Sequence, residues 1–412
     1  MRNLFKIAIR NLIRYQRRTL LTASLITIGV VFVLVFVSVS GSFKTMITGQ
    51  ITDSMMGHLQ IHRKGYVASI DNLPLNLNMK PKAYRIIQQA LAADAQVEAF
   101  SPRLKFGGMF SNFTETTNIR LNGVNPEAEF ITVPLLSSRI IEGRQTLGKG
   151  EILIPALLAR GMKIKPGDPV VIVATNADGS VNGKQFIVSG ILESATGPGG
   201  RDGYVHMDDA AEVLRMTEPQ VSEVAIRLKD FGRLAAAVAH LEKTTAGEVT
   251  PQGQPLLEVH SWEDLSPFFN IARMIDVMTL FIRIMLIAIV LISIMNVMVM
   301  AVYERIREIG TIAAIGTPPG KIRTMFILEG FCMGVVGAGA GVGIGAAIVA
   351  VINLIGIRFN FGLQKGLLLK ATLSLPDLLV VSIIVIVVAV LASLQPAVKA
   401  SRMEPIDALR HV

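Results

Sequence analysis

Two long uncharged stretches on either side of one short polar segment constrain this chain more than any other feature. Residues 284–303 and 330–357 contain no Asp, Glu, Lys or Arg. About 20 helical residues, each rising ~1.5 Å, cross the ~30 Å hydrocarbon core of a bilayer, so each stretch is long enough for a transmembrane helix. Two further uncharged runs, at 19–43 and 378–398, have comparable length. The sequence therefore predicts four membrane crossings.

The residues between the first and second crossings have a different composition. Residues 45–282 carry 22 Lys and Arg against 25 Asp and Glu, as a water-soluble domain does, in a chain that is otherwise 51% hydrophobic and 17% charged. The expected fold class is a membrane protein with four transmembrane helices, arranged one plus three. A large α+β extracytoplasmic domain is inserted between helices 1 and 2.

Local patterns place elements within that domain. Runs rich in β-branched residues and bounded by turn residues predict strands, and apolar residues at helical spacing predict helices. Strands are expected at 57–62, 118–123, 151–154, 170–174, 185–191 and 222–228, and helices at 82–93, 208–216 and 231–243. Ser261 and Asp264 fit a capping box, which would begin a helix that runs on into the second crossing.

The chain divides into nine expected segments. They are a cytoplasmic amphipathic interfacial helix (1–18), the first crossing (19–43), the extracytoplasmic α+β domain, with two lobes dividing near 135–150 as one option (44–275), the second crossing (276–303), a cytoplasmic coupling loop (304–323), the third crossing (324–357), a short outer loop (358–377), the fourth crossing (378–398) and a cytoplasmic C-terminal tail (399–412).

The distribution of Lys and Arg sets the expected orientation. Six precede Thr19, four lie in 304–323 and three follow Val398, whereas the short loop at 358–377 carries three. Because cytoplasmic segments carry the excess of Lys and Arg, both termini and the 304–323 segment are expected in the cytoplasm and the large domain outside. In residues 1–18, basic residues recur every four positions, which predicts a helix lying in the headgroup layer of anionic lipid.

Several classes of function are disfavoured by the residues present. The net charge of +9 is concentrated at helix ends instead of on the folded domain, which argues against a nucleic-acid partner. His58 and His62 share one face of an expected strand, but no third ligand lies near them in the sequence, so no metal site is expected. No Ser, His or Asp has the spacing of a known nucleophile motif, so no catalytic residue is expected.

The chain also lacks a nucleotide-binding motif. Residues 316–321 place Gly-Lys after a glycine, but the phosphate-loop spacing is missing and two prolines remove backbone N–H groups that a phosphate cradle needs. Any ATP and Mg²⁺ are therefore expected in a partner chain, and no cofactor is expected in this one.

The polar segment carries a recognisable motif. Glu304-Arg305-x-Arg307-Glu308-Ile309-Gly310, followed by Ala314-Ile315-Gly316 and by Phe326-x-x-Glu329-Gly330, resembles the signature of the FtsX/MacB/LolC-LolE type of ABC transporter permease. The ending Pro396-Ala397-x-x-Ala400-x-x-x-x-Pro405-Ile406-x-Ala408-Leu409-Arg410 resembles that of the same family, as does the one-plus-three arrangement around a large outer domain.

The resemblance implies partners and a location. The permease would pair with itself or with a related second permease and would bind two copies of a cytoplasmic ABC ATPase subunit. It would be a multi-pass protein of the bacterial inner membrane, surrounded by lipid, with its large domain in the periplasm. A periplasmic partner or a lipoprotein would meet that domain.

The resemblance also implies a coupling site. The residues expected to contact the ATPase are Glu304, Arg305, Arg307, Glu308, Ile309, Gly310 and Gly316. Their charges could pair with a soluble partner, while Ile309, Ile312 and Ile315 would offer an apolar face. The family often has Arg at the position of Ile312, so this contact differs in detail. An ordinary solvated loop is the alternative interpretation.

The third crossing is rich in glycine. Gly337, Gly341 and Gly345 are spaced by four and share one helix face, which permits close helix contact. Both packing within the subunit and a seam between two copies fit this pattern.

Three functions remain open from the sequence. The segments at 57–62, 150–154, 165–168 and 261–262 resemble the lipoprotein-releasing LolC/LolE group, which favours a mechanotransmission permease that extracts or exports an amphiphilic cargo, either a lipoprotein or a lipid-like molecule. However, the polar turn at 175–184 is too short for a projecting hook that would hand cargo to a chaperone. The alternatives are an FtsX-like relay that controls a periplasmic partner such as a cell-wall hydrolase, and a stand-alone membrane receptor.

Overall fold

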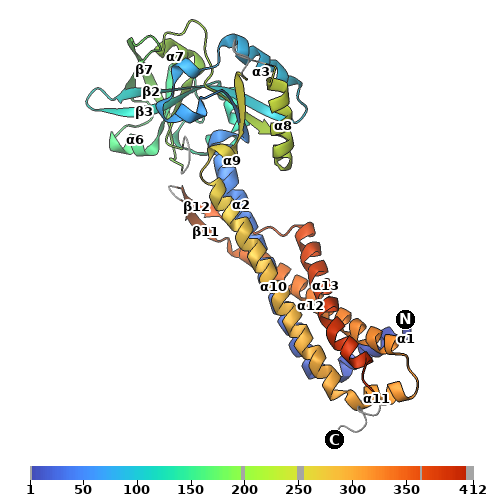
Figure 1. The fold of residues 1–412 in the computed structure, drawn as a ribbon. Coiled ribbons are helices and arrows are strands. Elements are labelled where there is room, and N and C mark those ends of the chain that lie inside the picture. The colour runs from blue at the N-terminus through green and yellow to red at the C-terminus, as the bar shows by residue number, and fades with distance from the viewer. Residues whose placement is uncertain (1, 196–199, 248–254, 362–363, 405–412) are drawn as a thin grey trace. The chain divides into compact units, whose positions relative to one another are not determined.

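The computed structural model describes residues 2–195, 200–247, 255–361 and 364–404, which form two compact units (Figure 1). The helical unit comprises Met1–Lys44, Arg273–Arg358 and Leu368–Val412, and the sheet unit comprises Thr45–Ala272 and Phe359–Leu367. The Pro405–Arg410 part of the C-terminal motif and most of the predicted tail lie outside the described residues.

Within the described residues, four helices are long and apolar enough to cross a membrane. They are α2 (Gln16–Ile51), α10 (Phe269–Glu304), α12 (Pro319–Ile355) and α13 (Leu375–Ser401). The 36 residues of α10 correspond to about 54 Å, more than the ~30 Å hydrocarbon core requires. Together with the domain between α2 and α10, they confirm the expected fold class.

Shorter elements accompany these helices. An amphipathic helix, α1 (Arg2–Arg14), precedes α2, with Ala8 and Leu12 buried and Lys6 and Arg10 exposed. The 304–323 segment, expected as a loop, contains α11 (Ile306–Ala314). The expected outer loop at 358–377 contains a hairpin of β11 (Arg358–Phe361) and β12 (Gln364–Leu368).

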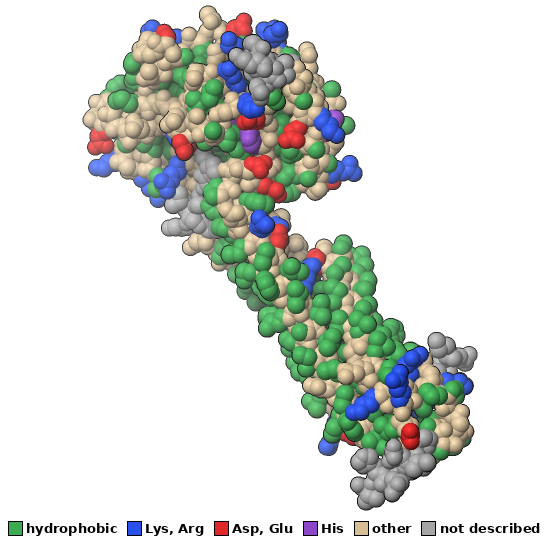
Figure 2. All heavy atoms as spheres, viewed as in Figure 1, with side chains coloured by type: hydrophobic (Ala, Val, Ile, Leu, Met, Phe, Trp, Pro, Cys, Tyr) green, Lys and Arg blue, Asp and Glu red, His purple; other side chains and the backbone are tan. Residues whose placement is uncertain are grey.

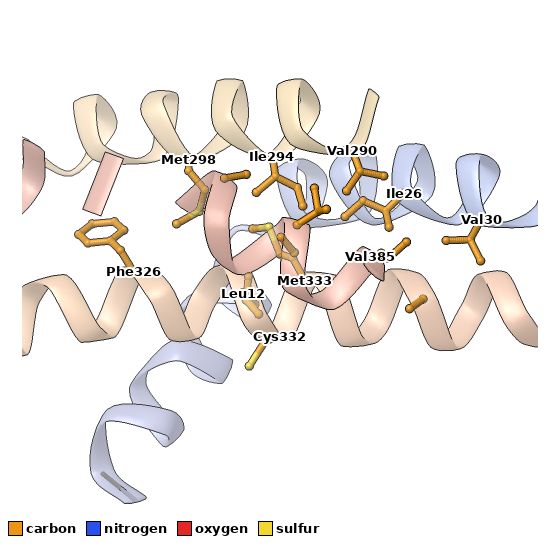
Figure 3. Close-up of a cluster of buried hydrophobic side chains, with 14 of the residues drawn as sticks. Leu12, Ile26, Val30, Val290, Ile294, Met298, Phe326, Cys332, Met333 and Val385 are labelled. Carbon is orange, nitrogen blue, oxygen red and sulfur yellow. The ribbon is translucent and has the colours of Figure 1, made fainter. Parts of the chain in front are cut away.

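The helical unit has its own apolar core, shown in Figure 3. Val30 of α2, Ile294 of α10 and Val385 of α13 contribute to it, and each is at most 1% exposed. Large apolar side chains also cover the outside of this unit, as Figure 2 shows. Because these outer side chains cannot be hidden from water within the chain, the unit needs an apolar solvent, which a bilayer supplies.

The sheet unit is built on ten strands. They are β1 (Leu59–Arg63), β2 (Val97–Ser111), β3 (Thr116–Val124), β4 (Ile140–Gly143), β5 (Glu151–Pro155), β6 (Pro169–Thr175), β7 (Val181–Leu192), β8 (Gly203–His206), β9 (Glu223–Leu228) and β10 (Leu257–Ser261). They pair in the order β10-β1-β9-β2-β3-β8-β5-β7-β4, and β6 pairs with β2 and β7. Pairing is therefore continuous, and no break in the sheet separates two lobes.

Helices flank this sheet. They are α3 (Pro81–Ala93), α4 (Pro126–Thr132), α5 (Leu135–Ser138), α6 (Ala156–Gly161), α7 (Met207–Val213), α8 (Leu234–Thr245) and α9 (Trp262–Leu265), with 3-10 turns at Val67–Asn72, Leu75–Leu77 and Phe231–Arg233 and a π-helical turn at Thr52–Met56. Figure 1 shows α3 and α8 at one end of the sheet unit and α6 at the other. Helix α3 begins with Pro at its first position and buries Ala83, Ile87 and Leu91, which recur every four residues.

The expected capping box is present, but the expected continuous helix is wrong. Asp264 Oδ2 accepts a hydrogen bond from Ser261 N at 2.9 Å, as the motif predicts. Helix α9 nevertheless ends at Leu265, because Ser266 is extended (φ −112°, ψ 124°) before Pro267. Helix α10 then begins separately at Phe269.

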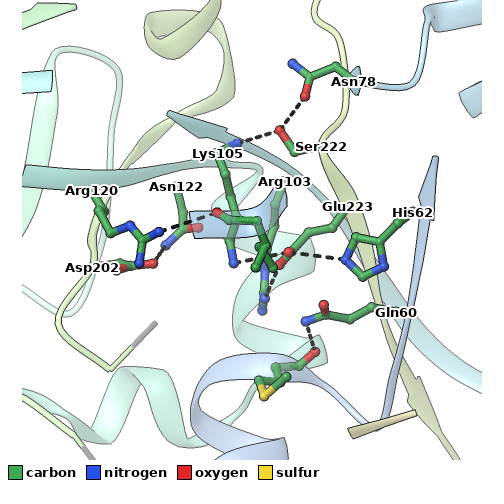
Figure 4. Close-up of polar contacts among 12 residues, drawn as sticks. Gln60, His62, Asn78, Arg103, Lys105, Arg120, Asn122, Asp202, Ser222 and Glu223 are labelled. Atoms are coloured by element: carbon green, nitrogen blue, oxygen red, sulfur yellow. Dashed lines mark hydrogen bonds and ion pairs between the residues drawn. The ribbon is translucent and has the colours of Figure 1, made fainter. Parts of the chain in front are cut away.

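A buried ionic network joins distant strands of the sheet unit (Figure 4). Arg103 of β2 lies 2.7 Å from Glu129 Oε1 and 2.9 Å from Glu223 Oε1. Lys105 Nζ and His62 Nε2 lie 3.1 Å and 3.7 Å from Glu223 Oε2. Burial alone would raise the pKa of Glu223, but Lys105, His62 and Arg103 together hold it well below its usual value.

We expect Glu223→Gln to destabilise the sheet unit by about 3 kcal/mol, because it leaves buried positive charge without its carboxylate. The chain has one tryptophan, Trp262, which is 3% exposed in this unit, so fluorescence-monitored unfolding of the full chain reports the change. Glu142→Gln makes the same chemical change at an exposed position and should shift stability by less than ~0.5 kcal/mol. Equal losses of stability in the two variants would show that the ionic network around Glu223 does not stabilise the sheet unit.

The lowered pKa of Glu223 also predicts a pH dependence. A carboxyl whose pKa is lower in the folded chain contributes stability above its unfolded pKa of about 4.3. This contribution is lost as pH falls through the folded pKa. Acid titration of unfolding should therefore show a smaller loss of stability in Glu223→Gln than in the wild-type chain.

Candidate functional site

The segment expected to couple to an ATPase is centred on α11. Arg305 precedes this helix with φ −113° and ψ 19°, which ends α10 and turns the chain. At the other end, Thr317 N donates to Ile312 O and Gly316 N donates to Ala313 O. This pair of bonds is a Schellman cap, and it requires the positive φ of +94° found at Gly316. Gly316 therefore ends the helix that the other predicted residues form.

Arg305 is the structural centre of this site. Its side chain is 5% exposed, Nη1 donates to Glu329 Oε1 at 3.0 Å and Nε donates to Glu308 Oε2 at 3.1 Å. Its guanidinium carbon lies 5.8 Å from the ring centroids of both Tyr15 and Phe326. Planar, weakly hydrated guanidinium groups suit such buried, ring-stacked positions.

Glu329 receives a second donor from the N-terminal helix. It lies in α12, is fully buried, and its Oε1 accepts a hydrogen bond from Asn11 Nδ2 of α1 at 2.7 Å. No described residue donates a hydrogen bond to its other oxygen, Oε2. A carboxylate in such surroundings is tolerated only with a charged partner, which Arg305 provides. One carboxylate therefore joins α1, α11 and α12.

Glu308 extends the network to the surface. It is 42% exposed, and its Oε1 lies 3.8 Å from Arg14 Nη1, where Arg14 is 69% exposed. This outer ion pair contributes little by itself because water screens it. The pair nevertheless places Arg14, at the end of α1, beside Glu308 of α11.

The predicted coupling residues thus fall into two groups. Arg305, Ile309 and Gly310 are buried within the chain. Glu304 and Arg307 are exposed, as are Ile312 (37%) and Ile315 (81%). The side chains of Arg305 and Ile309 anchor α11 within the chain, and their contact with an ATPase stays a prediction. The outer surface of α11 is formed by the second group.

Sequence reasoning missed Asn11, Tyr15 and the role of Glu329. Glu329 had a detectable signal, since it interrupts an apolar helix and an acid at such a position needs a partner. Asn11 and Tyr15 had none, because they lie about 300 positions away from their contacts, in a helix that was expected to lie in the headgroup layer, with contact to a cytosolic partner as an added role left open.

The three glycines of the predicted packing face lie against α2. A Cβ atom at Gly337 would lie 2.6 Å from Ile26, and one at Gly341 would lie 2.6 Å from Val30. At Gly345 the distance to Leu34 would be 3.3 Å. The glycine face therefore packs on α2 within the subunit, and a seam with a second copy stays a prediction.

The histidines considered for metal binding make other contacts. His58 Nδ1 accepts from Leu228 N at 3.0 Å, and His62 stacks on Tyr66 with ring centroids 5.5 Å apart. No group of three potential metal ligands occurs among the described residues.

Glu329→Gln should loosen α11, because Arg305 would keep only its half-exposed partner Glu308. We expect backbone amides of 306–314 to exchange hydrogen about tenfold faster, measured by mass spectrometry on the full chain. Glu404→Gln, the same change at an exposed position of the helical unit, should leave exchange unaltered. Unchanged exchange in Glu329→Gln would show that the ion pair does not hold α11.

Gly341→Ala should destabilise the helical unit by about 1–3 kcal/mol, because the new methyl group overlaps Val30. Gly339→Ala is the matched control, since no described atom lies within 4 Å of its added Cβ. Cys332 is the only cysteine and is buried in α12, so its reaction with a thiol probe during heating reports unfolding of this unit. The prediction fails if both variants unfold at the same temperature.

Two family models match the chain. The MacB-like periplasmic core domain matches residues 19–244, and the FtsX-like permease C-terminal domain matches residues 280–405. The first covers the first crossing and most of the sheet unit, and the second covers most of α10 together with α11, α12 and α13.

Individual relatives match between 71% and 98% of this chain. The lipoprotein-releasing system transmembrane protein LolC of Neisseria meningitidis serogroup B is 23% identical over 422 residues, covering 95% of this chain and 94% of the relative. LolC of Xylella fastidiosa (strain 9a5c) is 24% identical over 308 residues, which cover 71% of this chain and 72% of the relative. Macrolide export ATP-binding/permease protein MacB 2 of Aeromonas hydrophila is 23% identical, covering 98% of this chain and 60% of the relative.

Solved structures resemble the sheet unit more weakly. The periplasmic region of MacB from Actinobacillus actinomycetemcomitans is 11% identical, covers 56% of this chain and 95% of that one, and has a TM-score of 0.36. A TM-score this low does not assign the chain to a family. The family models, one of which spans more than half of the sequence, decide the assignment. The chain belongs to the ABC transporter permeases that combine a MacB-like periplasmic core domain with an FtsX-like C-terminal permease domain.

Proposed function

We propose that this permease is a mechanical link between a separate cytoplasmic ABC ATPase and its own periplasmic domain in the bacterial inner membrane. Two ATPase subunits, which would bind ATP and Mg²⁺, would act on a pair of permeases. The pair would be two copies of this chain or this chain with a related permease. Movement of the periplasmic domains would extract or export an amphiphilic cargo.

The observation that supports this proposal most is the division of α11 into an anchored and an exposed side. Arg305 ties the start of α11 to Glu329 of α12 and, through that carboxylate, to Asn11 of α1. A force on α11 would therefore be transmitted to both helices and would not be absorbed by a flexible loop.

The exposed side of α11 has the chemistry of a docking surface. Ile315 is 81% exposed at the polar end of the helical unit, where headgroups and water would surround it. Ile312 lies in α11, Ile315 is the C-cap residue of this helix, and the exposed charges of Glu304 and Arg307 lie near its start. Exposed apolar residues bordered by charges are typical of protein interfaces.

The nature of the cargo rests on the relatives. LolC proteins are named as parts of a lipoprotein-releasing system, and the two LolC relatives match 71% and 95% of the chain at 24% and 23% identity. We therefore propose a lipoprotein or a lipid-like molecule. The β6–β7 turn at 176–180 is tight, with Asn176 N donating to Ser180 O at 2.8 Å, so handover to a chaperone by a long hook is not part of the proposal.

Ile315→Asp tests the coupling surface. We expect it to reduce co-purification of the ATPase subunit by about tenfold, because a charge replaces an apolar interface residue. Ile131→Asp makes the same change at a 57% exposed position of the sheet unit and should not affect co-purification. Unchanged thiol reactivity of Cys332 would show that the helical unit of Ile315→Asp is folded, and unchanged unfolding followed by Trp262 fluorescence would show that the sheet unit of Ile131→Asp is folded. Normal ATPase binding by Ile315→Asp would reject this surface.

Depletion in cells separates the proposed cargo from the alternative function. Lipoproteins or lipids retained in the inner membrane would support extraction. A defect in cell-wall cleavage with normal lipoprotein sorting would support the relay to a wall hydrolase instead.

A further inference from the structure

A pocket of about 280 Å³ in the sheet unit lies at the N-terminal end of α3. The described residues that line it are Arg63, Asn78, Met79, Lys80, Lys82, Ala83, Leu256 and Leu257. Three of these are cationic and none is acidic. The pocket is separate from α11 and from the ionic network around Glu223.

The helix end at this pocket lacks a normal cap. Lys80 is the N-cap residue of α3, no side chain caps the helix, and its first turn contains no acid. The backbone N–H groups of Lys82 and Ala83 are therefore left for another acceptor. Lysines at the positive end of a helix dipole are unfavourable unless an anion lies between them, so this arrangement suits a bound anion.

Asn78 provides an independent sign of a ligand. It is 2% exposed, and its Oδ1 accepts from Ser222 Oγ at 2.9 Å, while Ser222 Oγ itself accepts from Lys105 N at 2.9 Å. Ser222 Oγ donates its proton to Asn78 Oδ1, so this bond does not engage the Nδ2 group of the amide. Figure 4 shows the Nδ2 group on the side away from Ser222, and it has no partner among the described residues.

The surrounding cations are also uncompensated. Within the described part of the chain, Arg63, Lys80 and Lys82 form no ion pair within 4 Å, and Arg63 Nη1 donates only to Asn76 O at 3.0 Å. A phosphate group has enough acceptor oxygens to satisfy an amide NH₂, helix N–H groups and several cations together. The remaining walls, Met79, Leu256 and Leu257, are apolar.

We propose that this pocket binds the phosphate group of an amphiphile, with the phosphate at the α3 N-terminus and the apolar part against Met79 and the two leucines. The same phosphate chemistry occurs in lipid headgroups and in free phosphate, and the apolar walls favour the lipid. This site goes beyond the coupling function, and its binding does not require the ATPase.

The test uses the full chain in phosphatidylcholine nanodiscs and calorimetric titration with dihexanoyl phosphatidic acid. We expect saturable binding that weakens about tenfold in Lys80→Gln/Lys82→Gln, because two charge-assisted contacts are lost. Lys163→Gln/Lys165→Gln is the matched control, since these two exposed lysines have the same spacing in the same unit. The control should bind as the wild-type chain does.

Three outcomes would overturn the proposal. Equal affinity in the two double variants would show that the α3 pocket is not the site. Equal binding of dihexanoyl phosphatidylcholine would show that the anionic phosphate is not recognised. Inorganic phosphate binding as tightly as the lipid would reduce the pocket to a free-anion site. Fluorescence-monitored unfolding through Trp262 shows whether each variant is folded.

Discussion

The helical unit depends on an ion pair placed where charge is expensive. Glu329 is fully buried in an apolar helix, and Arg305 is enclosed between two aromatic rings. Neither charge is tolerable there without the other, because desolvation of a lone ion outweighs every nearby favourable contact. The pair therefore fixes where α10 ends, where α11 begins and where α1 lies. Ile309 then packs inward because the first turn of α11 is already held.

The sheet unit, whose composition is that of a water-soluble domain, also contains a buried ion pair. Arg103 and Glu223 are both at most 2% exposed and bring together β2, β9 and α4. The elements joined in each unit are far apart in the sequence. Buried ionic contacts add specificity here because a wrong register of β2 would leave Arg103 and Lys105 unpaired in the interior.

Much of the fold could be predicted from the sequence, and the exceptions have physical causes. The four crossings follow from uncharged runs alone, and all six expected strands are present. The longest strand, β2, was not predicted, because Pro102, Arg103 and Lys105 interrupt the apolar pattern in the middle of the strand, where neighbouring residues such as Arg103 and Leu104 are both buried. Its charges are satisfied by Glu223, about 120 residues later, and local patterns do not show such pairing. The burial of Arg305 was missed because its buried partner, Glu329, lies in another helix, and local patterns do not show such pairing.

The contact between Asn11 and Glu329 spans 318 positions of sequence. It therefore constrains the order in which the membrane unit is assembled during translation. Helix α1 leaves the ribosome well before its buried partner, which follows only after residues 45–272 of the sheet unit and α10 have been made. Until then Asn11 and Tyr15 have no place to dock, so α1 must wait at the membrane surface. The docking of α1 is thus a late event of biogenesis, although its residues are made before those of the other described elements.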